Sequence, residues 1–210
     1  MRKIVWLMIA FAAYTLLASG KPTEQQKKIK PSQPAHLPTG DFAKGPPKGL
    51  EVASLAGGCF WGMEEIIRKI PGVIDTHVGY TGGNTSAPSY KEVSSGKTGH
   101  AESVQVLFDP KKLSYEGLLT FFFRMHDPTT LNQQGNDKGT QYRSVIFTYG
   151  NSQEKVTRDV IKKVDAKGRW KKPVVTQVMP AAPFWRAEPE HQDYLQKNPN
   201  GYTCHYLRDE

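Results

Sequence analysis

Cysteine is scarce in this chain of 210 residues, which contains only Cys59 and Cys204. Because the two stand about 145 positions apart, the chain has no CxxC pair, and it has no HExxH motif or histidines at metal-ligand spacing either. A zinc site is therefore not expected. The sequence also lacks a phosphate-cradling glycine-rich loop and a dinucleotide fingerprint, which removes the common nucleotide-binding signatures.

A long hydrophobic run is also missing. The longest, Ile4 to Ala18, has 15 residues, whereas a bilayer-spanning helix needs roughly 20. Two basic residues precede this run, and the small residues Ala18-Ser19-Gly20 end it. This pattern predicts a signal peptide over residues 1–20 and an exported protein, periplasmic or extracellular. An uncleaved membrane anchor is the alternative interpretation.

Residues 21–49 are rich in Pro, Lys, Gln and Gly and almost free of aliphatic residues, so we expect a disordered basic linker. Residues 1–50 hold 8 Lys/Arg against 2 Asp/Glu, while residues 51–210 hold 20 against 18. The net charge of +8 therefore comes mainly from the N-terminal segment. The domain over residues 50–210 carries mixed charge, and no nucleic-acid partner is expected.

Hydrophobic periodicity divides the domain into alternating elements. Strands are expected over 51–56, 73–80, 101–108, 142–149 and 174–179; helices are expected from 59 or 60 to 70, over 114–125 with Ser114 as N-cap, over 151–167 with Asn151 as cap, and over 188–197. Loops are expected over 81–99 and 126–141. The order predicts an α+β domain, a two-layer sandwich of helices on a mixed β-sheet with a ferredoxin-like βαββ core.

Cys59 follows two glycines at the point where a strand turns into a helix. Unpaired N–H groups at a helix N-terminus lower a thiol pKa, so this position predicts a nucleophilic thiolate. Phe60 and Trp61 flank it. Trp61 lies off the apolar helix stripe, which favours a pocket-lining role, whereas Phe60 fits core packing equally well. The alternative for Cys59 is a structural disulfide with Cys204 in an exported binding module.

Glu102 is in phase with Val104, Val106 and Phe108, on the apolar face of its strand. A buried carboxyl has a raised pKa and stays protonated, which suits a proton donor. The alternative is a strand-end Glu that reaches solvent. The long polar loop over 135–144 is a second region where site residues are expected.

Four segments together resemble one known family, the A-type peptide-methionine (S)-S-oxide reductases, across nearly all of residues 50–210. The first is Gly57-Gly58-Cys59-Phe60-Trp61-Gly62, which resembles the family's nucleophile motif. The second is Tyr90 to Gly96 followed by Thr98-Gly99-His100-Ala101-Glu102. The third is Asp137 to Ser144, and the fourth is Asn198-Pro199-Asn200-Gly201-Tyr202, which is similar to the approach to the recycling cysteine.

The resemblance implies thiol-dependent reduction of methionine S-sulfoxide, protein-bound or free, without metal or organic cofactor. It implies that Cys59 attacks the sulfoxide sulfur while Glu102 protonates the oxygen. The other implied roles are oxygen binding by Tyr90 and Tyr142, orientation of the substrate by Asp137, and substrate contacts from Phe60, Trp61 and Tyr202. Cys59 becomes a sulfenic acid, Cys204 forms a disulfide with it, and a thioredoxin-like protein reduces that disulfide. A monomer is expected.

One departure from the family concerns the tail. Many relatives carry the recycling cysteine directly after the residue that matches Tyr202, but here Thr203 intervenes and Cys204-His205-Tyr206 follows. The reach of Cys204 toward Cys59 is therefore open. A different cysteine enzyme, such as a hydrolase, would instead need a histidine base, for which His100 and His205 are available.

Overall fold

The computed structural model describes residue 42 and residues 45–209. The predicted signal peptide and most of the predicted linker lie outside the described residues. The main helices are α1 (Phe60–Ile67), α2 (Tyr90–Ser94), α3 (Tyr115–Met125), α4 (Asn151–Ala166) and α5 (Tyr194–Lys197), with a 3-10 helix η3 (Thr140–Tyr142). The strands are β1 (Glu51–Gly57), β2 (Val73–Thr81), β3 (Ala101–Phe108), β4 (Gln133–Gln134), β5 (Asp137–Lys138), β6 (Ser144–Thr148), β7 (Gln177–Pro180) and β8 (Trp185–Arg186).

Six of the strands form one mixed sheet in the order β7-β6-β1-β3-β2-β8. β1 is antiparallel to both of its neighbours, and β6 and β7 are parallel. The register places Tyr80 of β2 opposite Glu102 of β3. A separate two-stranded hairpin is formed by β4 and β5. The predicted mixed sheet is confirmed.

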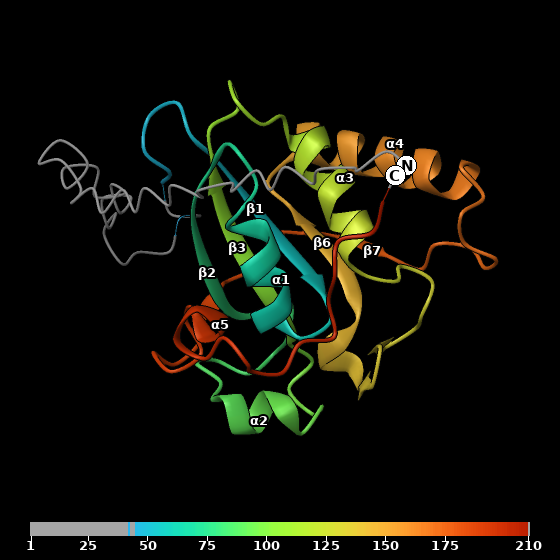
Figure 1. The fold of residues 1–210 in the computed structure, drawn as a ribbon. Helices are drawn as coiled ribbons and strands as arrows, with labels where there is room; N and C mark the ends of the chain where they lie inside the picture. Colours follow the sequence, from blue (N-terminus) through green and yellow to red (C-terminus); the bar gives the residue numbers. More distant parts are fainter. Residues whose placement is uncertain (1–41, 43–44, 210) are drawn as a thin grey trace, which may run out of the picture. The chain divides into compact units, whose positions relative to one another are not determined.

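Helices α1, α3 and α4 pack on the same face of this sheet, and Figure 1 shows α3 and α4 running beside each other. Phe60, Leu118 and Phe122 from these helices are fully buried against Leu55 and Val104 from the strands. Burying each such side chain contributes roughly 1.5–3 kcal/mol. The opposite face of the sheet carries smaller apolar clusters, one around Phe147 and one around Leu107 with Phe42. The predicted two-layer α+β sandwich is therefore confirmed.

Several predicted boundaries were wrong. Helix α1 ends at Ile67 rather than near residue 70, and the N-cap of α4 is Gly150, with Asn151 as its first residue. The predicted loop over 81–99 contains helix α2, and the predicted loop over 126–141 contains the β4–β5 hairpin. The last helix spans only Tyr194–Lys197, because Asp193 before it has a left-handed φ of 54°. Ser114 does cap α3, accepting from the Gly117 N–H at 3.0 Å.

The described part of the chain contains no helix with the length and apolar character needed to cross a membrane.

Candidate active site

Cys59 lies at the junction between the central strand β1 and helix α1, as its N-cap residue. Gly58, just before it, has a φ of 113°, in the region that favours glycine. A Cβ on Gly58 would also lie 2.6 Å from Gln134 Cγ and 2.9 Å from His205 Cε1. The glycine is therefore needed both for the turn and for the close approach of two distant segments. Only 5% of the Cys59 surface is exposed.

The electrostatics of Cys59 differ from the sequence prediction. Burial raises the pKa of the thiol well above its ordinary value, and the charge of Glu102 raises that pKa further. The N–H of Trp61 at the helix start lowers the pKa, as predicted, but with a smaller effect. The predicted thiolate was wrong because loss of hydration disfavours the anion more than one N–H group stabilises it. Cys59 is a thiol at neutral pH, so it must lose its proton during attack.

Glu102 lies beside this thiol on β3 with 1% of its surface exposed. Its Oε2 accepts the N–H of Phe60 at 3.1 Å, which ties the carboxyl to the first residue of α1. Burial raises the pKa of Glu102 to about 8, the Phe60 N–H lowers it, and the charge of Asp137 raises it. The prediction of a buried carboxyl with a raised pKa is confirmed, and the alternative of a solvent-reaching Glu is wrong.

The second oxygen of this carboxyl, Oε1, is buried and has no hydrogen-bond partner within the described chain. Leaving a buried polar atom unpaired costs about 1–3 kcal/mol. Such an atom beside a nucleophile points to a ligand group that completes the hydrogen bond. The group would have to be a hydrogen-bond acceptor when the carboxyl is protonated.

Three further predicted residues gather around Glu102. Burial and then the Glu102 charge raise the pKa of Tyr90, the first residue of α2, and of Tyr142, the last residue of η3. Asp137 on β5 accepts a hydrogen bond from the Tyr202 hydroxyl at 3.1 Å, and its other oxygen is buried without a partner among the described residues. Elements far apart in the sequence thus bring four oxygen-bearing side chains together, those of Glu102, Tyr90, Tyr142 and Asp137.

An aromatic cluster borders this group. Trp61 is half-buried; its Nε1 donates to His191 Nδ1 at 3.2 Å, and its ring stacks on Tyr194 at 3.9 Å between centroids. Phe60 is completely buried behind it, and its ring lies 6.3 Å from that of Tyr90. Phe60 thus belongs to the core, which agrees with the core-packing interpretation of its sequence position. Its contact with substrate stays a prediction.

The chain's C-terminal segment brings Cys204 to the nucleophile turn. The Cys204 thiol lies near enough to the turn for the backbone N–H of Cys59 to lower its pKa, and both cysteines are free thiols in the structure. Gly62 in α1 leaves room for this segment, since a Cβ there would lie 2.2 Å from Thr203 Oγ1. The intervening Thr203 therefore does not prevent Cys204 from approaching Cys59.

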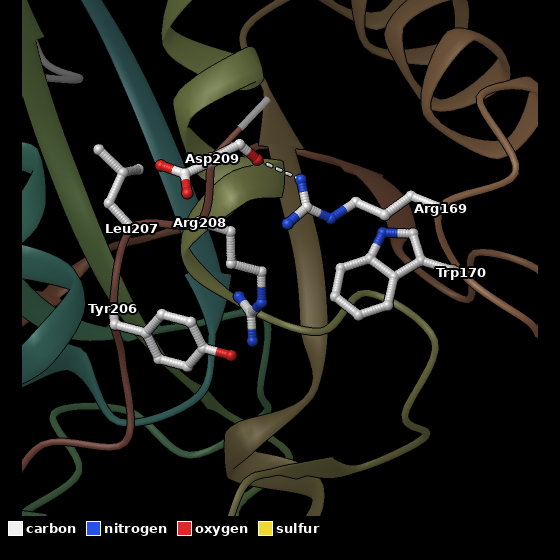
Figure 2. Close-up of a pocket in the computed structure, with 6 residues that line it drawn as sticks. All are labelled: Arg169, Trp170, Tyr206, Leu207, Arg208 and Asp209. Atoms are coloured by element: carbon white, nitrogen blue, oxygen red, sulfur yellow. Dashed lines mark hydrogen bonds between the residues drawn. The ribbon is translucent and has the colours of Figure 1, made fainter.

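Beyond Cys204 the tail is fastened to helix α3 and to the segment after α4. Arg208 and Arg124 exchange main-chain and side-chain hydrogen bonds, with Arg124 Nε donating to the Arg208 carbonyl at 2.8 Å. Figure 2 shows the Arg208 guanidinium between the rings of Trp170 and Tyr206, at 5.3 and 4.4 Å from the ring centroids. A hydrogen bond from Arg169 to the Asp209 carbonyl adds a further contact.

Sequence reasoning missed several residues of this region. Glu188 accepts from the Tyr80 hydroxyl and from the Tyr90 N–H, both at 2.8 Å, and so fixes α2 against β2. His191 and Tyr194 hold Trp61. None of the three forms a motif, so no local signal marks them. The described residues contain no cluster of three or more His, Cys, Asp or Glu side chains that could hold a metal ion.

A buried thiol at a strand–helix junction, next to a protonated carboxyl and with a second thiol at hand, defines the class of thiol-dependent reductases. The chain matches the family model "Peptide methionine sulfoxide reductase" over residues 51–210. It belongs to this family, as an MsrA-type methionine sulfoxide reductase.

Named relatives support this assignment. The peptide methionine sulfoxide reductase MsrA of Nocardia farcinica is 56% identical over 156 residues, which cover 74% of this chain and 89% of that protein. MsrA 2 of Rhodopirellula baltica is 54% identical, covering 75% of this chain and 92% of that protein. Reduced Mxr1 from Saccharomyces cerevisiae superposes with a TM-score of 0.74 at 42% identity, over 78% of this chain and 94% of Mxr1. Methionine sulfoxide reductase A of Corynebacterium diphtheriae gives 0.72 at 37% identity, over 75% and 79%.

Proposed function

We propose that this protein reduces the S epimer of methionine sulfoxide, in proteins or free, through a Cys59 sulfenic acid and a Cys59–Cys204 disulfide. The observation that carries the proposal is the unpartnered, buried oxygen of a protonated Glu102 beside the Cys59 thiol. A sulfoxide oxygen is a hydrogen-bond acceptor, and it is the group that this carboxyl lacks.

The first step conserves atoms and electrons. Glu102 gives its proton to the sulfoxide oxygen as Cys59 Sγ attacks the sulfoxide sulfur, and the Cys59 proton returns to Glu102. The sulfur–oxygen bond of the substrate breaks, methionine leaves, and Cys59 holds the oxygen as a sulfenic acid. The sulfoxide sulfur is reduced by two electrons and the cysteine sulfur is oxidised by two.

The remaining site residues bind and orient. The hydroxyls of Tyr90 and Tyr142, whose pKa values are raised, stay protonated and can donate to the same oxygen. The unpartnered oxygen of Asp137 can accept a main-chain N–H of the substrate. Trp61 offers an apolar surface to the methyl group of the substrate.

Cys204 closes the cycle. Its thiol attacks the sulfenic acid, a disulfide forms and water leaves. A thioredoxin-like dithiol then reduces the disulfide. This role is supported by the crystal structure of Saccharomyces cerevisiae Mxr1 in complex with Trx2, which superposes on this chain with a TM-score of 0.54 at 28% identity.

Export, inferred from residues 1–20, is part of the proposal. N-terminal sequencing of secreted protein should find Lys21 first, and retention of Met1 inside the cell would contradict export.

The test of the activity uses separated sulfoxide epimers. Peptides carrying methionine S-sulfoxide or R-sulfoxide are incubated with the full chain and dithiothreitol, and methionine is measured over time. We expect turnover of the S epimer and little of the R epimer. Ester or amide hydrolysis without thiol consumption would instead identify a cysteine hydrolase and overturn the proposal.

A further inference from the structure

His205 follows Cys204 directly and is almost completely buried in the nucleophile turn. Its Nε2 lies 2.8 Å from the carbonyl oxygen of Gly57. Its ring occupies the space where side chains at Gly58 and Gly62 would stand, since added Cβ atoms would lie 2.9 Å from its Cε1 and 2.8 Å from its Nδ1. His205 therefore packs directly against the turn that bears Cys59.

These contacts determine which ring nitrogen of His205 carries the hydrogen. A carbonyl oxygen can only accept, so Nε2 must carry the hydrogen and donate it to Gly57. Burial lowers the pKa of His205 to about 4, so the ring is neutral at physiological pH. Nδ1 consequently presents a lone pair, and it lies 3.4 Å from Cys204 Sγ. The thiol of Cys204 can therefore donate to Nδ1 in this contact, and the Asp137 side chain is a second acceptor beside it.

Cys204 needs such an acceptor. Burial, followed by the nearby Asp137 carboxylate, raises the pKa of Cys204 to about 12. At neutral pH the thiolate is a minute fraction, yet sulfur attacks as a thiolate or while losing its proton. The charged and titratable groups that face His205 are Asp137, which raises its pKa, and Arg208, which lowers it; His126 is a further neighbour in its surroundings.

We propose that His205 is a catalytic residue of the recycling step, accepting the Cys204 proton through Nδ1 while its Nε2 holds the tail against Gly57. The inference rests on the proposed function. In this step the S–S bond between Cys204 and Cys59 forms and the S–O bond of the sulfenic acid breaks. The proton held by His205 passes to the departing hydroxyl, which leaves as water, and the ring returns to its neutral form.

The test separates the two half-reactions. Reduced full-length protein is mixed with one equivalent of methionine sulfoxide without reductant, and samples are quenched by alkylation over time. Methionine reports the Cys59 step, and loss of the Cys204 thiol reports the recycling step. His205→Gln keeps an N–H that can reach Gly57 but removes the acceptor beside the sulfur. Leu207→Gln, at an exposed position of the same tail, is the matched control.

We expect His205→Gln to release methionine at the wild-type rate and to form the disulfide on the order of 100-fold more slowly, at the lower end of general-base effects. Leu207→Gln should match wild type in both steps. Wild-type disulfide formation in His205→Gln would overturn the role of His205. Absence of methionine in the wild type would instead overturn the proposed function, so the two failures are distinguishable.

A pH profile keeps the inference testable even where the variant folds poorly. With an internal acceptor, disulfide formation in the wild type should change little between pH 6 and 9. Without one, the rate should follow the thiolate fraction and rise about tenfold per pH unit below the Cys204 pKa. A tenfold rise per unit in the wild type would show that His205 only positions the tail.

Discussion

The two halves of the site are held in different ways. Cys59 lies between β1 and α1, and Glu102 lies on the neighbouring strand β3; these three elements pack into the main hydrophobic core. Cys204 belongs to a tail without regular secondary structure, fastened through His205 and Arg208. The half that reduces substrate is thus rigid, whereas the half that recycles the enzyme depends on a few side-chain contacts. A change in the tail should therefore affect recycling and leave sulfoxide reduction intact.

The largest effect is expected from removing the nucleophile. Cys59→Ser should abolish methionine production and leave the fold intact, because Cys59 is a free thiol and not part of a disulfide in the structure. Activity and chemical unfolding together check this. A variant that loses about 2–5 kcal/mol of stability would support the structural-disulfide alternative instead. Cys204→Ser, the matched control, should still yield one methionine per protein.

Removal of the proton donor Glu102 should have the second-largest effect. Glu102→Gln should lower the rate of methionine formation by roughly 100-fold or more, with a smaller effect on sulfoxide binding. In the wild type the pKa of Glu102 is about 8, so the protonated, active form predominates below pH 8 and falls tenfold per unit above it. Rapid-mix kinetics from pH 6 to 10 measure this. If the variant retains the wild-type rate and the same alkaline decline, Glu102 is not the acid.

A substitution where the two halves of the site meet tests whether they work separately. Gly62→Ala should stabilise helix α1 by about 0.5–1 kcal/mol. The added Cβ would, however, displace Thr203 and His205. We expect disulfide formation to slow about tenfold, because 1.4 kcal/mol of lost docking corresponds to that factor. Methionine formation should be unchanged. Gly117→Ala makes the same replacement in α3, 3.2 Å from the nearest atom, and should change neither rate. Equal slowing of both steps by Gly62→Ala would show that the halves are not separable.

The smallest effect should follow from the outer fastening of the tail. Arg208→Ala removes one side-chain hydrogen bond and the contacts with Trp170 and Tyr206, together about 1–2 kcal/mol of anchoring. The main-chain hydrogen bond from Arg208 to Arg124 remains. Disulfide formation should therefore slow only severalfold, as measured by alkylation of Cys204. A complete loss of recycling would show that the anchor at His205 cannot hold the tail alone.

Local patterns predicted much of the rigid half. The period of two along β3 placed Glu102 in the core, and the glycines before Cys59 located the turn correctly. The direction of the Cys59 pKa could not be predicted, because burial depends on the packed tertiary structure. Helix α2 was missed although Ser89 and Glu92 form a capping box, since its five residues are too few for a helical period.

The tail was much less predictable. Tyr194 stacks on Trp61, and His205 binds Gly57 across 148 residues, so neither contact has a local sequence signature. The β4–β5 hairpin that carries Asp137 consists of two-residue strands, too short for an alternating pattern. These elements are specified by long-range packing, which is why only the family resemblance predicted the roles of Asp137 and Cys204 in the reaction.

Mass spectrometry of the reduced full-length protein, mixed with stoichiometric methionine sulfoxide and no reductant, shows directly whether Cys59 and Cys204 together complete the reaction. We expect one methionine per protein, loss of both thiols and a Cys59–Cys204 linkage. One methionine with Cys59 oxidised and Cys204 free would assign recycling to an external thiol. No methionine at all would show that Cys59 does not reduce methionine sulfoxide.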